Sequence, residues 1–441
     1  MNLDLKSKFV DEFEKFGNSL NGESLTENFQ LRKIAFENFK LKGFPTIKNE
    51  EWKYTNISFL NKLDFVLSLE EPVTNITKED IKELLFDDLN ENLLVFIDGF
   101  YFSELSVIKS ELKNGLYIGS ISEALKSNLA GIELLGKTIE KSDDSFTHLN
   151  NVYYRDGAYI NIPENMELTE PIHILNIIDA RQNNPFVNTR NLIIAGNNSR
   201  VKLVETYHQF GNNSGFSNNI TEIIANSDSI VDYNKFQNDD KDLYQVGTTQ
   251  VIQEKRSVFH GNTVTIKGKF VRNNLNSFLN DEHCESNFNG FYFLDNKDFV
   301  DNHTLVDHAK PNCNSNENYK GIIDDEAKAV FNGKIMVWKD AQKTIAYQSN
   351  KNILLSDNAT VNTKPQLEIF ADDVKCSHGA TSGNLDETQL FYLRARGISE
   401  DKAKALLLYA FSANVIDRIT IPVLKENIKR LIAERLNVEV E

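Results

Sequence analysis

The middle of the chain, from about residue 150 to about residue 380, is a series of short stretches in which apolar and polar residues alternate. Examples are RVKLVETYH, TVTIKGKFV and KIMVWKD, separated by polar clusters such as GNNS, NSDS and NDDKD. This pattern predicts a long succession of β-strands. Because no helix-length periodic segment lies between them, a doubly wound α/β sheet is disfavoured. Two sandwiches, a large barrel and a β-solenoid remain open, and Asn, Gly and Asp suit the corners of a solenoid.

Amphipathic helices are predicted before this β-rich region. One apolar stripe recurs at helical spacing near the start of the chain, formed by Leu3, Leu5, Phe9, Phe13 and Phe16. A second predicted helix carries the stripe Leu31, Ile34, Ala35 and Phe39. The segment GFPTIKNEEWKYTNISFL then contains a proline and is typical of a linker, which we expect Trp52 and Tyr54 to dock against a neighbouring element.

Three further helices are predicted after Gly383. Asp386 is suited to cap the first in a capping box with Gln389, and Gly397 is suited to end it. Ser399 is suited to cap the second, whose expected apolar face is Ala403, Leu406, Leu407, Ala410 and Phe411. Pro422 is expected to open the third, with the apolar side Leu424, Ile428, Leu431, Ile432 and Leu436. The pattern is equally consistent with docking of a partner and with packing on the β-rich region.

The charge and cysteine content exclude several classes of partner. The formal net charge is -16, from 64 acidic and 48 basic residues, so the protein repels nucleic acid and anionic membrane surfaces. The 3 cysteines are widely spaced, which does not suggest a disulfide framework and fits a reducing compartment. The first residues contain acids and no apolar signal-peptide core, and the longest apolar run, at 405–416, is shorter than a membrane-spanning helix. We therefore expect a soluble cytoplasmic protein.

The most informative local motif is KCSHGATSG, in which Cys376 precedes His378 by two residues and glycines follow in an expected turn. In an extended strand the two α-carbons are about 6.6 Å apart, too far for a tight nucleophile-base pair, although a shared metal would be within reach. Two ligands do not complete a metal site, and no second paired motif is present. From these residues alone, a buried cysteine and a histidine without special chemistry are favoured.

Other catalytic motifs give no support for an enzyme. His303, His308 and Cys313 have regular spacing, but in an extended region that spacing does not place them on one face, so structural roles are favoured. The chain has no G-x-S-x-G elbow, no Walker A loop and no G-x-G-x-x-G turn. We therefore expect no ATP site in this chain.

Several segments together resemble the SufD branch of the SufB/SufD family, which belongs to the SUF iron-sulfur cluster assembly system. They are the motif LEIFADDVKCSHGATSGNLDETQLFYLRARGIS, the preceding AYQSNKNILLSDNATVNTKPQLEI, the element VFNGKI and the early GFPTIKNEEWKYT. The resemblance spans nearly the whole chain. It implies a mainly β protein, with a right-handed parallel β-helix core flanked by helical domains. The implied domains are an N-terminal helical domain at 1–90, the β-helix with its entry segment at 91–395 and a C-terminal helical domain at 396–441.

The resemblance also implies a function and partners. A SufD-like chain is a non-catalytic scaffold that pairs with SufB through the β-helix and holds SufC, an ATPase, through its C-terminal helices. A transient iron-sulfur cluster forms at the SufB-SufD interface, where His378 is the implied iron ligand and Cys376 lies close to it. The sequence does not indicate whether a flavin is bound. A β-helix polysaccharide lyase and a structural homodimer are the alternatives.

Overall fold

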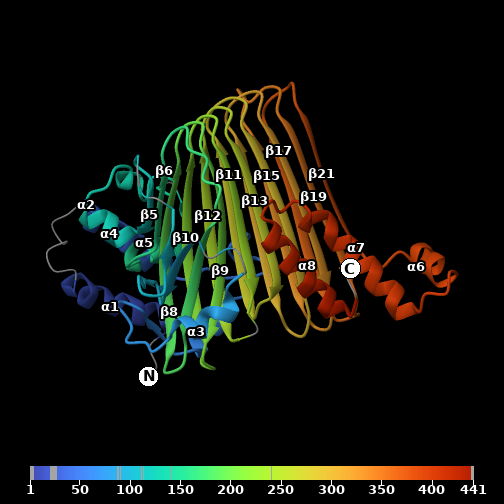
Figure 1. Cartoon of the computed structure of the whole chain (residues 1–441), viewed down its shortest axis with the longest axis horizontal. Helices are drawn as coiled ribbons and strands as arrows, with labels where there is room; N and C mark the ends of the chain where they lie inside the picture. Colours follow the sequence, from blue (N-terminus) through green and yellow to red (C-terminus); the bar gives the residue numbers. More distant parts are fainter. Residues whose placement is uncertain are drawn as a thin grey trace.

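The protein is a β-solenoid with helices at both ends (Figure 1). The computed structural model describes residues 4–19, 27–86, 89, 91–110, 112, 114–140, 142–239 and 241–438. In the described structure strands (42%) predominate over helices (24%), and the solenoid has about 7 turns. The mainly β fold with a parallel β-helix core between helical regions is therefore confirmed.

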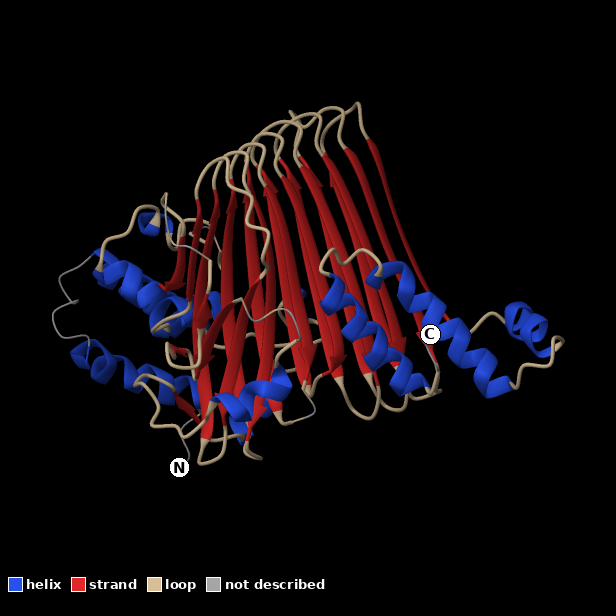
Figure 2. Cartoon of the chain, viewed as in Figure 1, coloured by secondary structure: helices blue, strands red, loops and turns tan. Residues whose placement is uncertain are grey.

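The solenoid consists of two sheets, and from residue 158 onward successive strands alternate between them (Figure 2). The first sheet has 10 strands: β5 (Tyr117–Ser120), β6 (Ala158–Ile162), β8 (Asn184–Ala195), β10 (Gly215–Ala225), β12 (Leu243–Gln253), β14 (Phe270–Leu279), β16 (Phe299–His308), β18 (Lys328–Val337) and β20 (Thr360–Ile369) in spatial order, with β1 (Phe65–Leu67) beside β8. The second has 11: β3 (Phe100–Tyr101), β2 (Asn92–Ile97), β7 (Ile172–Asp179), β9 (Arg200–Phe210), β11 (Ile230–Asn238), β13 (Val258–Lys267), β15 (Glu285–Leu294), β17 (Asn314–Ile323), β19 (Ile345–Leu354) and β21 (Lys375–Gly383), with β4 (Val107–Ile108) beside β2.

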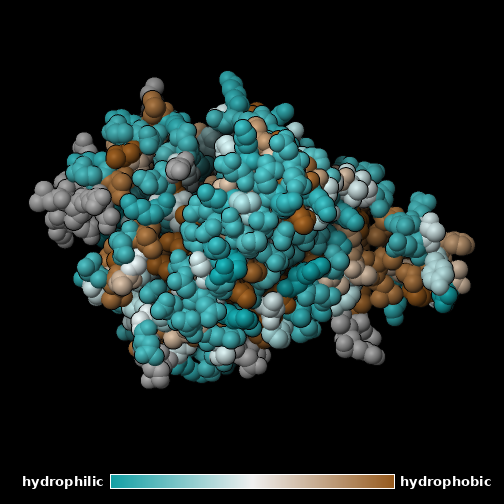
Figure 3. All heavy atoms as spheres, turned by 90° about the horizontal axis from the view of Figure 1, so that it is seen from above, coloured by the Kyte–Doolittle hydropathy of each residue, from teal (hydrophilic) through white to brown (hydrophobic). Residues whose placement is uncertain are grey.

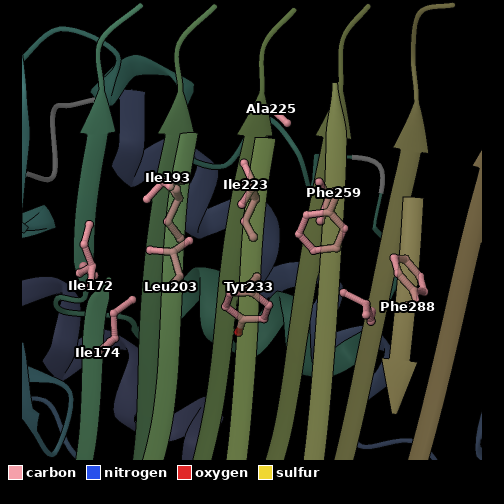
Figure 4. Packing of buried hydrophobic residues seen from close by; sticks show 14 of the residues in the cluster. Ile172, Ile174, Ile193, Leu203, Ile223, Ala225, Tyr233, Phe259 and Phe288 are labelled. Atoms are coloured by element: carbon pink, nitrogen blue, oxygen red, sulfur yellow. The ribbon is translucent and has the colours of Figure 1, made fainter. Parts of the chain in front are cut away.

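The main core lies between the two sheets. Strands of consecutive turns pair in parallel, so residues at matching positions stack on one another: Ile193 pairs with Ile223, and Leu203 with Tyr233 (Figure 4). All four side chains are buried. Because a residue and its ladder partner face the same side, the alternating pattern of each strand assigns one set of side chains to this core and the other to the outer face.

The α-helices of the described part of the chain are α1 (Leu5–Ser19), α2 (Glu27–Lys42), α3 (Lys78–Ile81), α4 (Ile121–Lys126), α5 (Ser145–Tyr153), α6 (Glu387–Arg394), α7 (Glu400–Ile416) and α8 (Pro422–Leu436), and short 3-10 helices lie at Glu50–Trp52, Ser58–Lys62, Lys82–Leu84 and Ile132–Leu134. Among them, no helix is both long and apolar enough to cross a membrane. The predicted Leu3 of the first stripe lies outside the described residues.

The N-terminal region packs on the outer face of the first sheet through an aromatic cluster. Phe9 and Trp52 are buried there against Phe146, Phe186 and other rings. Trp52 stacks on Phe146 with ring centres 5.3 Å apart. Docking by Trp52 is therefore confirmed, whereas docking by Tyr54 is wrong, since that side chain is 42% exposed.

The buried face of α2 differs from the predicted stripe. Leu31 and Ile34 are exposed, and Arg32 is buried beside Ala35 and Phe39. The Arg32 guanidinium donates to the carbonyl oxygens of Val152 at 2.7 Å and Tyr154 at 3.1 Å. These carbonyls are at the C-terminal end of α5, where a helix leaves acceptors unsatisfied and favours a cation.

The helices α7 and α8 pack on the outer face of the second sheet. On α8, Leu424, Ile428 and Ile432 are buried as predicted, and their neighbours in the cluster include Phe293 and Ile322 of the sheet. On α7 the predicted face is only partly correct, because the buried residues are Ala403, Ala405, Leu408, Ser412, Val415 and Ile416. By contrast, α6 buries none of its residues and projects from the body of the molecule (Figure 1).

Candidate functional site

The last turn of the solenoid is open. β20 and β21 are the final strands of their sheets, and each pairs with a strand on one side only. Every residue of β21 is exposed except Cys376, which is partly buried. The turn that contains the candidate motif therefore presents two free strand edges and the uncovered end of the core.

The two free edges differ in the backbone groups that they offer. In a parallel ladder, alternate residues bond to opposite neighbours. The Lys375 N–H donates to the Thr344 oxygen at 2.9 Å, so the backbone groups of Cys376 and His378 face the free edge of β21. On β20, the Thr360 N–H donates to the Ala327 oxygen at 3.1 Å, which places Pro365 among the free-edge positions. Proline has no N–H and suits an unpaired edge, so β21 is the better edge for an added strand.

His378 lies at the mouth of the core. Its ladder partner on β19 is Gln348, whose side chain is 3% exposed within the core. Matching residues of neighbouring parallel strands face the same side, so the His378 side chain faces the interior of the solenoid. It is exposed only because no further turn covers it.

Cys376 faces the same side as His378 but has a more apolar environment. Its ladder partner is Ala346, and it packs on a cluster that includes Ile335, Val337 and Ala371. Burial raises the pKa of the Cys376 thiol, against a smaller opposing effect of a hydrogen bond with the Ala346 backbone. A raised pKa lowers the thiolate fraction, which makes this cysteine a weaker metal ligand and nucleophile than an ordinary one.

The glycines of the motif belong to the strand, and the turn expected there is wrong. β21 continues without interruption to Gly383. A β-carbon added to Gly379 or Gly383 would meet no described atom within 4 Å apart from those of its chain neighbours. The fold of this chain therefore does not require glycine at these positions, and they leave room for close approach by another backbone.

Apolar side chains surround the open end. Trp338 stacks on Phe370 with ring centres 5.9 Å apart, and these rings are 47% and 57% exposed. Ile345 and Tyr347 of β19 are also exposed, on the outer face of the second sheet, since they alternate with the buried Ala346 and Gln348. Clustered exposed apolar groups are typical of an interaction surface.

The structure does not bring the other candidate residues together. His303 is on the outer face of the first sheet, where its Nε2 lies 3.0 Å from Asp301 Oδ1. His308 and Cys313 are buried, and His308 Nε2 lies 2.9 Å from Ser315 Oγ. In the part of the chain that the structure describes, no group of three or more His, Cys, Asp or Glu side chains could hold a metal ion.

The sequence interpretation missed the polar residues beneath His378. Gln348 is followed in the next turn inward by Glu317, which is fully buried. Only knowledge of the register between turns reveals this relationship. The free edge of β20 could have been predicted from Pro365, because a proline inside a strand pattern indicates an edge strand.

Comparison with known proteins assigns the family. Residues 176–411 match the family described as "SUF system FeS cluster assembly, SufBD core domain", and residues 3–174 match the "SufBD protein N-terminal region". The chain belongs to the SufBD family. It is similar to an iron-sulfur cluster assembly SufBD family protein of Synechocystis, with 31% identity over 89% of this chain and 87% of the relative.

Relatives named SufD show which branch of the SufBD family this is. SufD of Escherichia coli is 29% identical over 89% of this chain and 90% of its own length. SufD of Bacillus subtilis is 25% identical over 92% and 93%. The chain is a SufD-type protein of iron-sulfur cluster assembly.

Proposed function

We propose that the chain is a non-catalytic scaffold whose open last turn pairs with a SufB-type subunit, so that a nascent iron-sulfur cluster is held between the two proteins. The observation that carries this proposal is the position of His378 on β21, a free, exposed strand edge at the mouth of the core. Strand addition would satisfy the free backbone groups of this edge and cover the open end of the core.

In this proposal His378 supplies an imidazole nitrogen to the iron of the cluster, which is the cargo of the complex. Neutral imidazole is a good ligand for iron near neutral pH. Cys376 is two residues away on the same face, and its raised pKa favours a packing role or a secondary one. The other coordination positions would be filled by the partner.

We further propose that α6 and the start of α7 hold the SufC-type ATPase. Phe391 and Tyr392 of α6 are 72% and 56% exposed. By contrast, most apolar residues of α7 and α8 pack against the solenoid. Apolar side chains gather at this end of the molecule (Figure 3). The three free cysteines fit work in the reducing cytoplasm.

Co-expression with the SufB and SufC subunits of the same system tests the scaffold role. A stable complex should form, and it should build clusters from iron and sulfide faster than the same subunits without this chain. Equal rates with and without the chain would refute the proposal. Size-exclusion chromatography with light scattering measures the mass of the particle that forms. A homodimer that does not bind SufB would support the alternative of a structural homodimer.

A further inference from the structure

A line of polar side chains runs through the core toward the open end. Glu317 of β17, Gln348 of β19 and His378 of β21 are successive ladder partners. Glu317 and Gln348 are 0% and 3% exposed. The outermost member of the line is the candidate iron ligand, so groups beneath it can act on the imidazole.

The opposite sheet determines where these side chains can find partners. Thr304, Gly333 and Pro365 are successive ladder partners there. The Thr304 hydroxyl donates to Glu317 Oε2 at 2.5 Å, and a β-carbon on Gly333 would lie 2.4 Å from Gln348 Nε2. In the two turns beneath the open end, Thr304 therefore lies opposite Glu317, and Gly333 lies opposite Gln348. By the same succession Pro365 is opposite His378, and it offers no N–H and no polar side-chain atom.

The amide of Gln348 is held in a way that leaves one acceptor free. Its Nε2 donates to Glu317 Oε2 at 3.3 Å, and Gly333 leaves the space that the side chain fills. Its Oε1 is buried and has no hydrogen-bond partner in the part of the chain that the structure describes. A buried acceptor without a partner is unfavourable, so an N–H that reached it would stabilise the site. The adjacent side chain toward the open end is His378.

We propose that Gln348 is the positioning residue for His378: its Oε1 accepts a ring N–H of His378, which fixes one tautomer and leaves the other ring nitrogen free to face the partner. This inference rests on the proposed role of His378 as an iron ligand. Metal-binding imidazoles commonly hold their second nitrogen in this way, and the hydrogen bond sets both ring orientation and basicity. Glu317 and Thr304 act one step further back by holding the Gln348 amide.

The tautomer of His378 tests the inference directly on the full chain. The ring ¹⁵N signals of labelled histidine, assigned by comparison with His378→Ala, should show one tautomer at a pH where the ring is neutral. Gln348→Leu should convert His378 to a mixture of both tautomers, and Gln348→Glu, which keeps an acceptor oxygen, should preserve one. Thr363→Val is the control, because the Thr363 hydroxyl of β20 is also a buried polar group without a hydrogen-bond partner among the described residues. A tautomer that survives Gln348→Leu, or that is lost in Thr363→Val, overturns the inference.

Cluster formation by the complex separates this inference from the proposed function. If both hold, Gln348→Leu weakens iron binding about 10–100-fold, whereas Gln348→Glu restores most of it. If His378→Ala builds clusters at the wild-type rate while the tautomer still depends on Gln348, the ligand role fails and the positioning contact stands. If His378→Ala loses cluster formation and Gln348→Leu leaves the tautomer unchanged, the positioning role fails alone.

Discussion

The Thr304 hydroxyl donates a hydrogen bond to Glu317 Oε2 at 2.5 Å, from one sheet of the solenoid to the other. The contact holds a carboxyl group in the middle of the core, where burial raises the pKa of Glu317 to about 7 from 4.5. Hydrogen bonds from Thr304 and Gln348 oppose this shift but do not cancel it.

The first prediction is a pH dependence of stability that comes from Glu317. The folded state binds this proton more tightly than the unfolded state, so the free energy of unfolding falls as pH rises from 4.5 to about 7. The full loss is about 3 kcal/mol. Glu317→Gln should remove it, so that the variant gains about that amount relative to wild type between about pH 4 and about pH 8. Urea unfolding at the two pH values measures this.

A matched substitution on the surface provides the control for that measurement. Glu326 is 61% exposed and pairs with Lys297. Glu326→Gln should change the free energy of unfolding by less than about 0.5 kcal/mol at either pH. An equal pH response in wild type and Glu317→Gln would show that Glu317 does not titrate in this range.

The second prediction concerns the attachment of the N-terminal segment. Arg272 donates to Asp301 Oδ2 at 2.7 Å and to the Glu51 carbonyl at 2.8 Å, and its guanidinium lies 3.8 Å from the centre of the Trp52 ring. Asp301 is fully buried, so Arg272→Met leaves a buried carboxylate without its arginine and should cost about 3–5 kcal/mol. The exposed pair Arg256–Asp228 gives the control, since solvent screens this pair and Arg256→Met should lower the free energy of unfolding far less than Arg272→Met does. Equal losses in urea unfolding would contradict this account.

The third prediction tests the proposed ATPase contact. Phe391→Ser with Tyr392→Ser should abolish capture of the SufC subunit, because these exposed side chains are the unpacked apolar groups of α6. The melting temperature should stay close to that of wild type, since neither residue is buried. Val73→Ser changes a fully exposed apolar residue elsewhere and should leave capture intact. If the α6 variant still captures SufC, the ATPase binds another surface of this chain.

The fourth prediction tests pairing through the edge of β21. The Ala380 N–H faces the free edge, on the same alternation that places the Lys375 N–H on β19. Ala380→Pro removes this donor and should abolish pairing with SufB in a pull-down while the chain stays folded. Ala380→Ser changes the side chain but keeps the N–H, and it should pair normally. Normal pairing by both variants would show that the partner does not add to this strand.

The succession of strands was predictable from the sequence because alternation between core and surface is a local property of each strand. The faces of the helices were less predictable. Arg32 replaces Leu31 on the buried side of α2 because it satisfies carbonyls of α5, which lie far away in the sequence. Similarly, Ser412 is buried on α7 with its hydroxyl bonded to the Tyr409 carbonyl at 2.7 Å. Local periodicity contains no information on such long-range or backbone contacts.

The candidate site was predictable only in part, for a related reason. The motif placed Cys376 and His378 on one face of a strand, in agreement with their ladder partners Ala346 and Gln348, which are both buried. The line from His378 to Gln348 and Glu317 depends on the register between turns of unequal length, and no single turn reveals it. The free edge of β21 was not predictable for the same reason, because it depends on which strand ends the sheet.

The rate of cluster formation by the His378→Ala complex tests the central claim most directly. Complexes with wild-type chain, His378→Ala and Cys376→Ala are purified with SufB and SufC and supplied with iron and sulfide. The account predicts that all three assemble, that His378→Ala forms clusters at a small fraction of the wild-type rate, and that Cys376→Ala is affected less. A fully assembled His378→Ala complex that forms clusters at the wild-type rate would contradict the ligand role of His378, and failure of that complex to assemble would show that His378 serves the interface instead.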